Sequence, residues 1–326
     1  MTQMQKMERM EQKQMKQKQM KQILIISGKG GTGKTTLTAE FARLAQKAVI
    51  ADCDVDAANL SLLCAPSGTA QKEPFYSGFA LDFNADQCIE CGLCAKACRF
   101  DAISARQSEA SVSSLSVAAS APGSSIIIDH LSCEGCGACV DVCPSAALGL
   151  RDKQVGHLYS ADTAYGPMVW GELGIAEGTS GKLVAQVRQQ AVRLAEEQQL
   201  SLIITDGPPG IGCPVIASLS GIDAAVVVTE PSVSGRHDLH RILELCSHFN
   251  VLPFVVINKW DLNPVISQEI ESFCGENKIV VLGSIPFDPL FPKALANGEL
   301  LSQFAPQSES LKVIEEVYQK LIQAIL

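Results

Sequence analysis

The sequence predicts an α/β protein whose mostly parallel sheet is covered by helices on both faces. Short unbroken apolar runs recur along the chain, and segments with helical periodicity lie between them. The predicted strands are 22–27, 49–54, 201–206, 224–230, 253–258 and 278–283. Strands without polar alternation are typical of a parallel sheet that is buried on both sides. With 326 residues, 47% of them hydrophobic, the chain is long enough to bury a large core.

The first predicted strand leads into a glycine-rich loop, GKGGTGKT at 28–35, and a predicted helix follows. The loop fits GxxxxGK[ST] in the strand–loop–helix setting that a phosphate-binding loop requires. Its backbone N–H groups would bind a polyphosphate, Lys34 would reach the β- and γ-phosphates, and Thr35 would bind Mg²⁺. The residues expected to contact the nucleotide here are Gly28, Gly30, Gly31, Thr32, Gly33, Lys34, Thr35 and Thr36.

Eight of the thirteen cysteines form two runs of the pattern CxxCxxCxxxC, at 88–98 and 133–143. This spacing suits [4Fe–4S] clusters, and the fourth cysteine of each run normally binds the cluster of the other run. The first predicted cluster is held by Cys88, Cys91, Cys94 and Cys143, and the second by Cys133, Cys136, Cys139 and Cys98. Zinc also takes four thiolates, but zinc sites more often show paired CxxC units. The two runs together resemble a bacterial two-cluster ferredoxin.

The cysteine runs interrupt the strand–helix alternation, and this indicates one domain inserted into another. We expect a discontinuous α/β domain of residues 22–72 and 156–326, with a ferredoxin-like domain at 73–155 between its two parts. A Ser/Ala-rich stretch at 105–125 is typical of a flexible connector or an irregular hairpin. Residues 1–21 hold six of the seven methionines and no aromatic residue, so they are predicted to form a disordered tail.

Lys29 gives the phosphate loop a second lysine directly after its first glycine. A lysine at this position resembles the deviant Walker A motif of the MinD/ParA/nitrogenase-iron-protein superfamily. The resemblance implies an ATPase that forms a nucleotide-sandwich dimer, either a homodimer or a pair with a related subunit. It also implies that Lys29 reaches the nucleotide of the partner, where a positioned cation stabilises the transferred phosphoryl group.

Two further segments carry the same resemblance. DCDVDAANL at 52–60 is similar to switch I of that superfamily, and DGPPG at 206–210 is similar to its Walker B and switch II segment. By this resemblance Asp54 orients the attacking water. Asp52 and Asp206 then support the Mg²⁺ ion together with Thr35.

The base-side motif is open to two interpretations. NKWD at 258–261 matches the NKxD pattern in which the aspartate of GTPases reads guanine. In the MinD-like family the asparagine at this strand end contacts the base of ATP, and IPFD at 285–288 resembles that family's other base-side loop. We therefore expect ATP, with Asn258 as the base contact, and retain GTP as the alternative.

Two more features have competing interpretations. Cys213 lies seven residues after Asp206, an offset at which the nitrogenase iron protein has a cluster ligand, but the segment 178–182 lacks the cysteine that would complete the likeness. Cys213 is thus either a packing residue or a functional thiol. The last predicted helix, 309–326, has an apolar stripe that fits docking on the core better than binding to a membrane surface. The stripe consists of Leu311, Ile314, Val317, Leu321 and Ile325.

The net charge of −9 argues against a general attraction to nucleic acid or anionic lipid. No apolar run approaches the roughly 18–20 residues that span a bilayer, and the polar N-terminus is unlike a signal peptide. We expect a cytoplasmic protein without stable membrane insertion. Its predicted function is ATP hydrolysis coupled to electron transfer toward a redox partner. The alternatives are an iron–sulfur cluster or metal-cofactor assembly and carrier ATPase, with a cluster-accepting partner, and a partition or positioning ATPase with a redox sensor.

Overall fold

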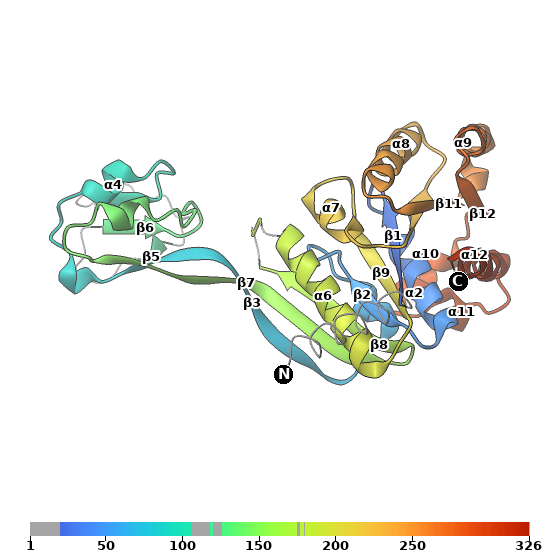
Figure 1. Ribbon diagram of the computed structural model, residues 1–326, viewed down its shortest axis with the longest axis horizontal. Coiled ribbons are helices and arrows are strands. Elements are labelled where there is room, and N and C mark those ends of the chain that lie inside the picture. The colour runs from blue at the N-terminus through green and yellow to red at the C-terminus, as the bar shows by residue number, and fades with distance from the viewer. Residues whose placement is uncertain (1–19, 106–117, 120–125, 175–176, 179, 326) are drawn as a thin grey trace, which may run out of the picture. The chain divides into compact units, whose positions relative to one another are not determined.

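The computed structural model describes residues 20–105, 118–119, 126–174, 177–178 and 180–325 (Figure 1). The chain divides into two compact units, one of residues 1–73, 157–173 and 179–326 and the other of residues 74–156 and 174–178. No helix in the described ranges is both long and apolar enough to cross a membrane. Residues 1–19 of the predicted tail and most of the connector at 105–125 lie outside the described residues. The predicted tail was two residues too long, because Met20 is buried and Lys21 begins the first strand.

The first unit is built on a large sheet. Its strands are β1 (Lys21–Ser27), β2 (Val49–Asp52), β3 (Ser67–Phe83), β7 (Leu148–Thr163), β8 (Gly166–Leu173), β9 (Leu202–Pro209), β10 (Ala224–Thr229), β11 (Leu252–Asn258) and β12 (Val280–Ile285). Their order is β12-β11-β10-β1-β9-β2-β8-β7-β3, and each neighbouring pair from β12 to β8 is parallel. This confirms the predicted α/β fold with a mostly parallel sheet.

Helices cover both faces of this sheet (Figure 1). They are α2 (Lys34–Ala45), α3 (Leu60–Cys64), α6 (Ser180–Gln198), α7 (Cys213–Leu219), α8 (Val233–His248), the one-turn η2 (Trp260–Leu262), α9 (Pro264–Glu276), α10 (Leu290–Ala296), α11 (Leu301–Phe304) and α12 (Glu309–Ile325). Side chains alternate along β1, since successive residues of a strand point to opposite faces. Ile23 and Ile25 pack with α2 and α12, whereas Leu24 and Ile26 pack with α7, α8 and α9.

The C-terminal helix α12 docks on the sheet as its apolar stripe predicts. All five stripe residues, from Leu311 to Ile325, are buried. Ile314, Val317 and Leu321 pack in the same core cluster as Phe41 of α2. The helix therefore closes one face of the core beside the helix that follows the phosphate loop.

Two long strands that were not predicted from the sequence bound the interval with the cysteine runs. β3 and β7 have 17 and 16 residues, and each begins in one unit and ends in the other. Most side chains of β3 are exposed, so its sequence has no unbroken apolar run that would identify a buried strand. β8, also absent from the prediction, follows β7 after only two residues and lies beside it in the sheet, which makes the pair a hairpin.

The second unit has a small core of its own. Its elements are η1 (Ala85–Gln87), α4 (Leu93–Ala97), β4 (Ile103–Ala105), β5 (Ala118–Ala119), β6 (Ile126–Asp129) and α5 (Ala138–Asp141), together with the adjoining parts of β3 and β7. β6 pairs antiparallel with both β4 and β5. Cys94 and Cys139 are buried in the core with Leu81, Ile128 and Leu148. Two short cysteine-bearing helices thus pack on one three-stranded sheet.

Candidate functional site

The phosphate loop lies between β1 and α2, where the motif requires it. Gly33 caps α2 with a left-handed φ of 89°, and a Cβ at this position would lie 2.5 Å from Nδ2 of Asn258. The same Nδ2 donates a hydrogen bond of 2.7 Å to the carbonyl oxygen of Thr32. Glycine is therefore needed at residue 33 both for its backbone angle and for the close approach of Asn258.

Three side chains of α2 contact the carboxylate of Asp206, which lies within β9. The Nζ atom of Lys34 lies 3.0 Å from one carboxylate oxygen, Thr35 donates its hydroxyl to the other at 2.7 Å, and Thr38 donates to the first at 3.0 Å. β9 lies between β1 and β2 in the sheet, which places the carboxylate under the start of α2. Thr38, one turn after Lys34, was not identified from the sequence because it lies outside the motif.

Asp52 and Asp54 lie at the end of the neighbouring strand β2. Both carboxylate oxygens of Asp52 accept backbone hydrogen bonds, from Asp54 N at 3.0 Å and from Leu60 N at 3.1 Å. Asp52 therefore shapes the loop that carries Asp54. The carboxylate of Asp54 lies 3.6 Å from Nζ of Lys34, so one ammonium group stands among three carboxylates.

The charges in this cluster do not balance, and the pKa values reflect this. Burial of Asp52, together with the nearby Asp206 carboxylate, raises the pKa of Asp52 to about 8. Burial also raises the pKa of Asp54, against the opposing charge of Lys34. Burial alone would lower the pKa of Lys34, but Asp206 and Asp54 outweigh it and the pKa is raised. The cluster has excess negative charge and oxygen ligands, which is the donor set that Mg²⁺ prefers.

The phosphate loop forms one end of a cleft of about 650 Å³. Lys34, Thr35 and Asp54 lie at that end, and the other end is apolar, with Phe287, Phe291, Leu295 and Ile314. The hydroxyl of Thr32, which also lines the cleft, is buried and has no hydrogen-bond partner among the described residues. A charged end and an apolar end separated in this way match the phosphates and the base of a nucleotide.

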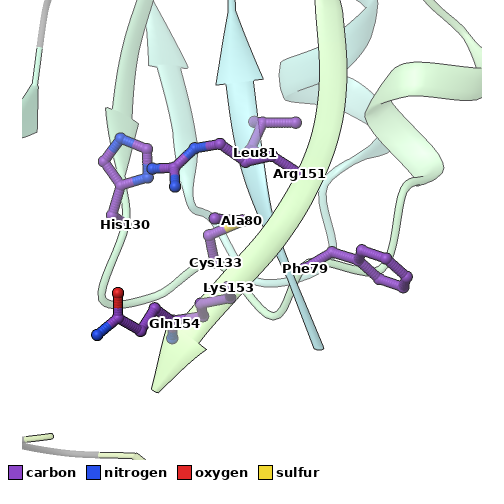
Figure 2. Close-up of a pocket in the computed structure, with 8 residues that line it drawn as sticks. All are labelled: Phe79, Ala80, Leu81, His130, Cys133, Arg151, Lys153 and Gln154. Atoms are coloured by element: carbon purple, nitrogen blue, oxygen red, sulfur yellow. The ribbon is translucent and has the colours of Figure 1, made fainter. Parts of the chain in front are cut away.

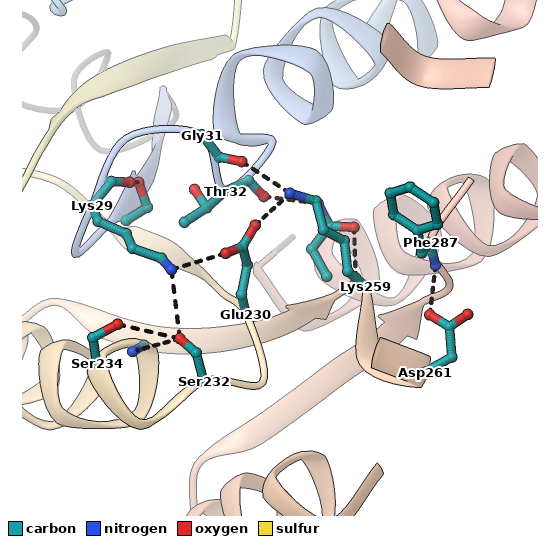
Figure 3. A network of polar contacts seen from close by, with 12 residues as sticks. Lys29, Gly31, Thr32, Glu230, Ser232, Ser234, Lys259, Asp261 and Phe287 are labelled. Carbon is teal, nitrogen blue, oxygen red and sulfur yellow. Dashed lines mark hydrogen bonds and ion pairs between the residues drawn. The ribbon is translucent and has the colours of Figure 1, made fainter. Parts of the chain in front are cut away.

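Asn258 and Asp261, the two NKWD residues considered as base contacts, have different positions. Asn258 lines the cleft, whereas Asp261 is not among its lining residues. Instead, the Asp261 carboxylate accepts a hydrogen bond of 2.6 Å from the backbone N–H of Phe287 (Figure 3). Asp261 thus anchors the loop 285–288 that lines the apolar end of the cleft.

Lys29 reaches residues at the end of β10, whereas Lys34 contacts Asp206. Its Nζ atom lies 3.0 Å from the Glu230 carboxylate and 3.5 Å from the Ser232 hydroxyl (Figure 3). Lys259 contacts the other carboxylate oxygen of Glu230 and donates to Gly31 O at 3.1 Å. Burial acts to raise the pKa of Glu230, but the hydrogen bonds and charges of Lys259 and Lys29 outweigh it and the pKa is lowered. Lys29 is therefore paired within its own chain.

The eight cysteines of the two runs line two small cavities of the second unit. One cavity is lined by Cys88, Cys91, Cys94 and Cys143, and the other by Cys98, Cys133, Cys136 and Cys139. Each set combines three cysteines of one run with the fourth cysteine of the other. Gly135 allows the second run to pass close to β3, because a Cβ there would lie 2.1 Å from Phe79 O.

A further hollow of about 240 Å³ adjoins the second cysteine cavity at Cys133 (Figure 2). His130, Arg151 and Lys153 line it, and no carboxylate does so among the described residues. Lys153 is paired with Glu177 at 2.9 Å. Lys153 is therefore compensated, and the adjoining cysteine cavity that also contains Cys133 is lined by the carboxylate residue Glu134.

No three His, Cys, Asp or Glu side chains in the described part of the chain are close enough to share a single metal ion. A [4Fe–4S] cluster does not require its ligands to share one metal ion, since each thiolate binds a separate iron of the cage.

The five remaining cysteines divide by burial. Cys53, Cys64, Cys246 and Cys274 are buried, and burial raises the pKa of each thiol, so they act as small apolar residues. Cys213 is exposed at the start of α7, near the backbone of Gly181. Its role was left open by the sequence, and the structure adds that its thiol is accessible.

Comparisons with known proteins agree with this geometry. The CobQ/CobB/MinD/ParA nucleotide binding domain (CbiA) matches residues 23–301. An uncharacterised protein of Methanocaldococcus jannaschii is 34% identical over 289 residues, which are 88% of this chain and 91% of that protein. The cytosolic Fe–S cluster assembly factor nubp2 of Danio rerio is 23% identical over 145 residues, 39% of this chain and 53% of that protein.

Solved structures show the same fold. The Pyrococcus furiosus cell division ATPase MinD has a TM-score of 0.52 at 16% identity, covering 93% of this chain and 99% of its own. Cyanothece McdA in complex with ATP has a TM-score of 0.53 at 18% identity, covering 93% and 96%. The family match spans most of the sequence and includes the phosphate loop, Asp206 and Asn258. The chain therefore belongs to the CobQ/CobB/MinD/ParA family of nucleotide-binding P-loop ATPases.

Proposed function

We propose that the first unit binds and hydrolyses MgATP in a dimer, and that the second unit holds two [4Fe–4S] clusters whose electron transfer depends on the nucleotide state. The observation that carries the proposal is the match between the cavities and the cysteine pattern. Each cavity is lined by four cysteines in the crossed combination that a two-cluster ferredoxin uses. The neighbouring unit belongs to an ATPase family.

The residues of the cleft fit a magnesium–nucleotide complex. The unpartnered hydroxyl of Thr32 and the backbone of the phosphate loop are available to phosphate oxygens. Thr35 and Asp206 would hold Mg²⁺, with Asp52 supporting the loop beside them, and Lys34 would contact the phosphates. Asn258 and the loop anchored by Asp261 would hold the base. ATP is favoured over GTP because the Asp261 carboxylate is bound to the Phe287 backbone.

Hydrolysis would use residues at the charged end of the cleft. Asp54 lies at that end and is held near Lys34, which suits a carboxylate that orients the attacking water. Lys29 would stabilise charge on the nucleotide of the second subunit, which is a homomeric or related partner. Neither role needs a residue from the second unit.

The thiols of the second unit would hold the clusters as the pattern predicts. The first set is Cys88, Cys91, Cys94 and Cys143, and the second is Cys133, Cys136, Cys139 and Cys98. Bound clusters supply one-electron transfer at low potential. The acceptor would be a redox protein.

A second candidate function is assembly or delivery of iron–sulfur clusters. It is favoured by the relatives named as cytosolic Fe–S cluster assembly factors, which align over less than half of this chain, and by the exposed thiol of Cys213. In that case the clusters would be cargo that leaves the protein.

Both functions are tested by purifying the full-length chain without oxygen. We expect about eight irons and about eight acid-labile sulfides per chain, and MgATP-dependent dimers that hydrolyse ATP. An apo-protein acceptor mixed with the loaded chain separates the candidates, since a carrier loses iron to it while an electron-transfer protein keeps its iron. A chain that takes up no iron–sulfur cluster on reconstitution contradicts the proposal.

A further inference from the structure

We infer that Glu230 is a positioning residue for Lys29, which it holds inside its own subunit until the nucleotide-bound dimer draws the lysine to the partner. The inference rests on the proposed ATP-dependent dimer and adds a residue that no motif of the family resemblance contains. Glu230 lies just after β10, about two hundred residues from the phosphate loop in the sequence. Its proximity to Lys29 is known only from the fold.

The contact between Lys29 and Glu230 is well formed. The ammonium lies 3.0 Å from the carboxylate, whose side chain is 16% exposed, and the Ser232 hydroxyl is a weaker second acceptor at 3.5 Å (Figure 3). The lysine side chain itself is 36% exposed. One end of the pair is thus fixed in the protein, and the other borders solvent, from where the lysine can leave.

A second lysine lowers the free-energy cost of releasing Lys29 from Glu230. Removing one partner of a buried ion pair normally leaves an uncompensated charge, at a large cost in free energy. Here Lys259 contacts the other oxygen of the Glu230 carboxylate, so Glu230 stays paired when Lys29 departs. Ser232 also keeps a partner, because its hydroxyl accepts a hydrogen bond of 3.0 Å from Gly235 N. The acceptors that hold Lys29 are therefore satisfied with or without it.

The contact between Lys29 and Glu230 competes with dimer formation, because both require the same lysine side chain. If only the released lysine can reach the partner's nucleotide, the apparent affinity between subunits is reduced by the fraction of released lysines. A homodimer needs two such releases. Glu230 would thereby keep subunits apart when nucleotide is scarce, without contacting the nucleotide itself.

The test compares Glu230→Gln with wild type by sedimentation of the full-length chain in a non-hydrolysable MgATP analogue. Loss of a partly exposed ion pair should raise the fraction of released Lys29 about threefold in each subunit. The dissociation constant of the dimer should therefore fall about tenfold. The matched control is Glu177→Gln, which removes an ion pair of similar length and exposure, with Lys153 at 2.9 Å, in the other unit. The control should leave dimerisation unchanged.

Two further measurements distinguish the proposed positioning role of Glu230 from a purely structural role. The monomer's affinity for MgADP should stay within about twofold in Glu230→Gln, and a fall of tenfold or more would mean that Glu230 only supports the phosphate loop. In a Lys29→Met background, Glu230→Gln should no longer tighten the dimer, because it acts through Lys29.

Equal tightening with and without Lys29, or unchanged or weaker dimers in Glu230→Gln, overturns the inference. A wild-type chain that stays monomeric with the analogue contradicts the proposed dimer itself, and the inference falls with it.

Discussion

The ammonium of Lys29 and the carboxylate of Glu230 lie 3.0 Å apart in the same chain, at the surface end of the phosphate loop. Five residues further on, Lys34 points into the protein and contacts Asp206. The two lysines of one short loop therefore serve different partners. Lys34 belongs to the buried carboxylate cluster, and Lys29 borders solvent.

Replacing Lys29 by methionine should abolish most ATP turnover without preventing nucleotide binding. Cations supplied to a phosphoryl group from a second protein contribute about 10³–10⁵ in rate, so we expect a loss of at least about a thousandfold. Affinity for MgADP should change less than about threefold, since Lys29 does not line the cleft. Steady-state hydrolysis and fluorescent-ADP titration measure the two effects. Wild-type turnover in the variant would show that Lys29 has no part in hydrolysis.

Gly33→Ala should destabilise the protein, whereas Gly30→Ala should not. A side chain at residue 33 meets Asn258 and forces a left-handed backbone, at a cost of about 1–3 kcal/mol. A Cβ at residue 30 would have no neighbour within 4 Å in the described part of the chain. Urea unfolding of the nucleotide-free variants measures both. Similar unfolding free energies for the two variants would mean that the close approach of Asn258 is unimportant.

The crossed cysteine sets make a specific spectroscopic prediction. Cys143→Ser and Cys88→Ser should lose the same EPR signal, and Cys98→Ser and Cys133→Ser should lose the other. Cys274→Ala, which changes a buried cysteine outside both cavities, should keep both signals. If Cys143→Ser instead loses the signal that Cys133→Ser loses, each run binds its own cluster and the assignment is wrong.

Asp261 should affect adenine and guanine nucleotides alike. Its carboxylate fastens the backbone of Phe287, so Asp261→Ala loosens the apolar end of the cleft and should weaken ATP binding about three- to tenfold. A residue that reads guanine would instead change GTP affinity selectively. Competition of ATP and GTP for a fluorescent nucleotide, in wild type and variant, distinguishes the two roles.

The carboxylate cluster predicts that stability without Mg²⁺ falls as pH rises. The pKa of Asp52 is raised to about 8, well above its unfolded value near 4. Between about pH 4 and pH 8 the folded state therefore holds a proton that the unfolded state has lost. The stabilisation that this proton gives the folded state is complete below about pH 4 and is lost as the pH rises through about 8. The slope can reach about 1.4 kcal/mol per pH unit.

Urea unfolding in EDTA between pH 5 and 8 measures this slope for wild type and Asp52→Asn. The variant, which cannot ionise at this position, should show a flatter dependence. Parallel curves for the two proteins would mean that Asp52 does not bind that proton.

Sequence patterns identified the parts of the protein whose chemistry depends on local spacing. The phosphate loop needs a fixed order of glycines, lysine and threonine, and the cysteine runs need short fixed intervals. The apolar stripe of α12 was equally recognisable, because a helix that covers a core repeats its buried positions regularly. These features are determined within about twenty residues of chain.

Contacts between distant segments could not be predicted in this way. Glu230 meets Lys29 and Lys259 only because β10, β1 and β11 are neighbours in the sheet. Thr38 reaches Asp206 for the same reason. The strand β3 escaped notice because most of its side chains are exposed. β7 mixes buried, half-buried and exposed positions, so neither strand has an unbroken apolar run that sets it apart from a loop.

The measurement that tests the central claim most directly is an anaerobic redox titration of the loaded chain, followed by EPR in three states: without nucleotide, with MgADP and with a non-hydrolysable MgATP analogue. If the ATPase unit controls the clusters, the analogue should shift at least one reduction potential on the order of tens of millivolts, or change its line shape. Identical potentials and spectra in all three states would contradict nucleotide-dependent electron transfer.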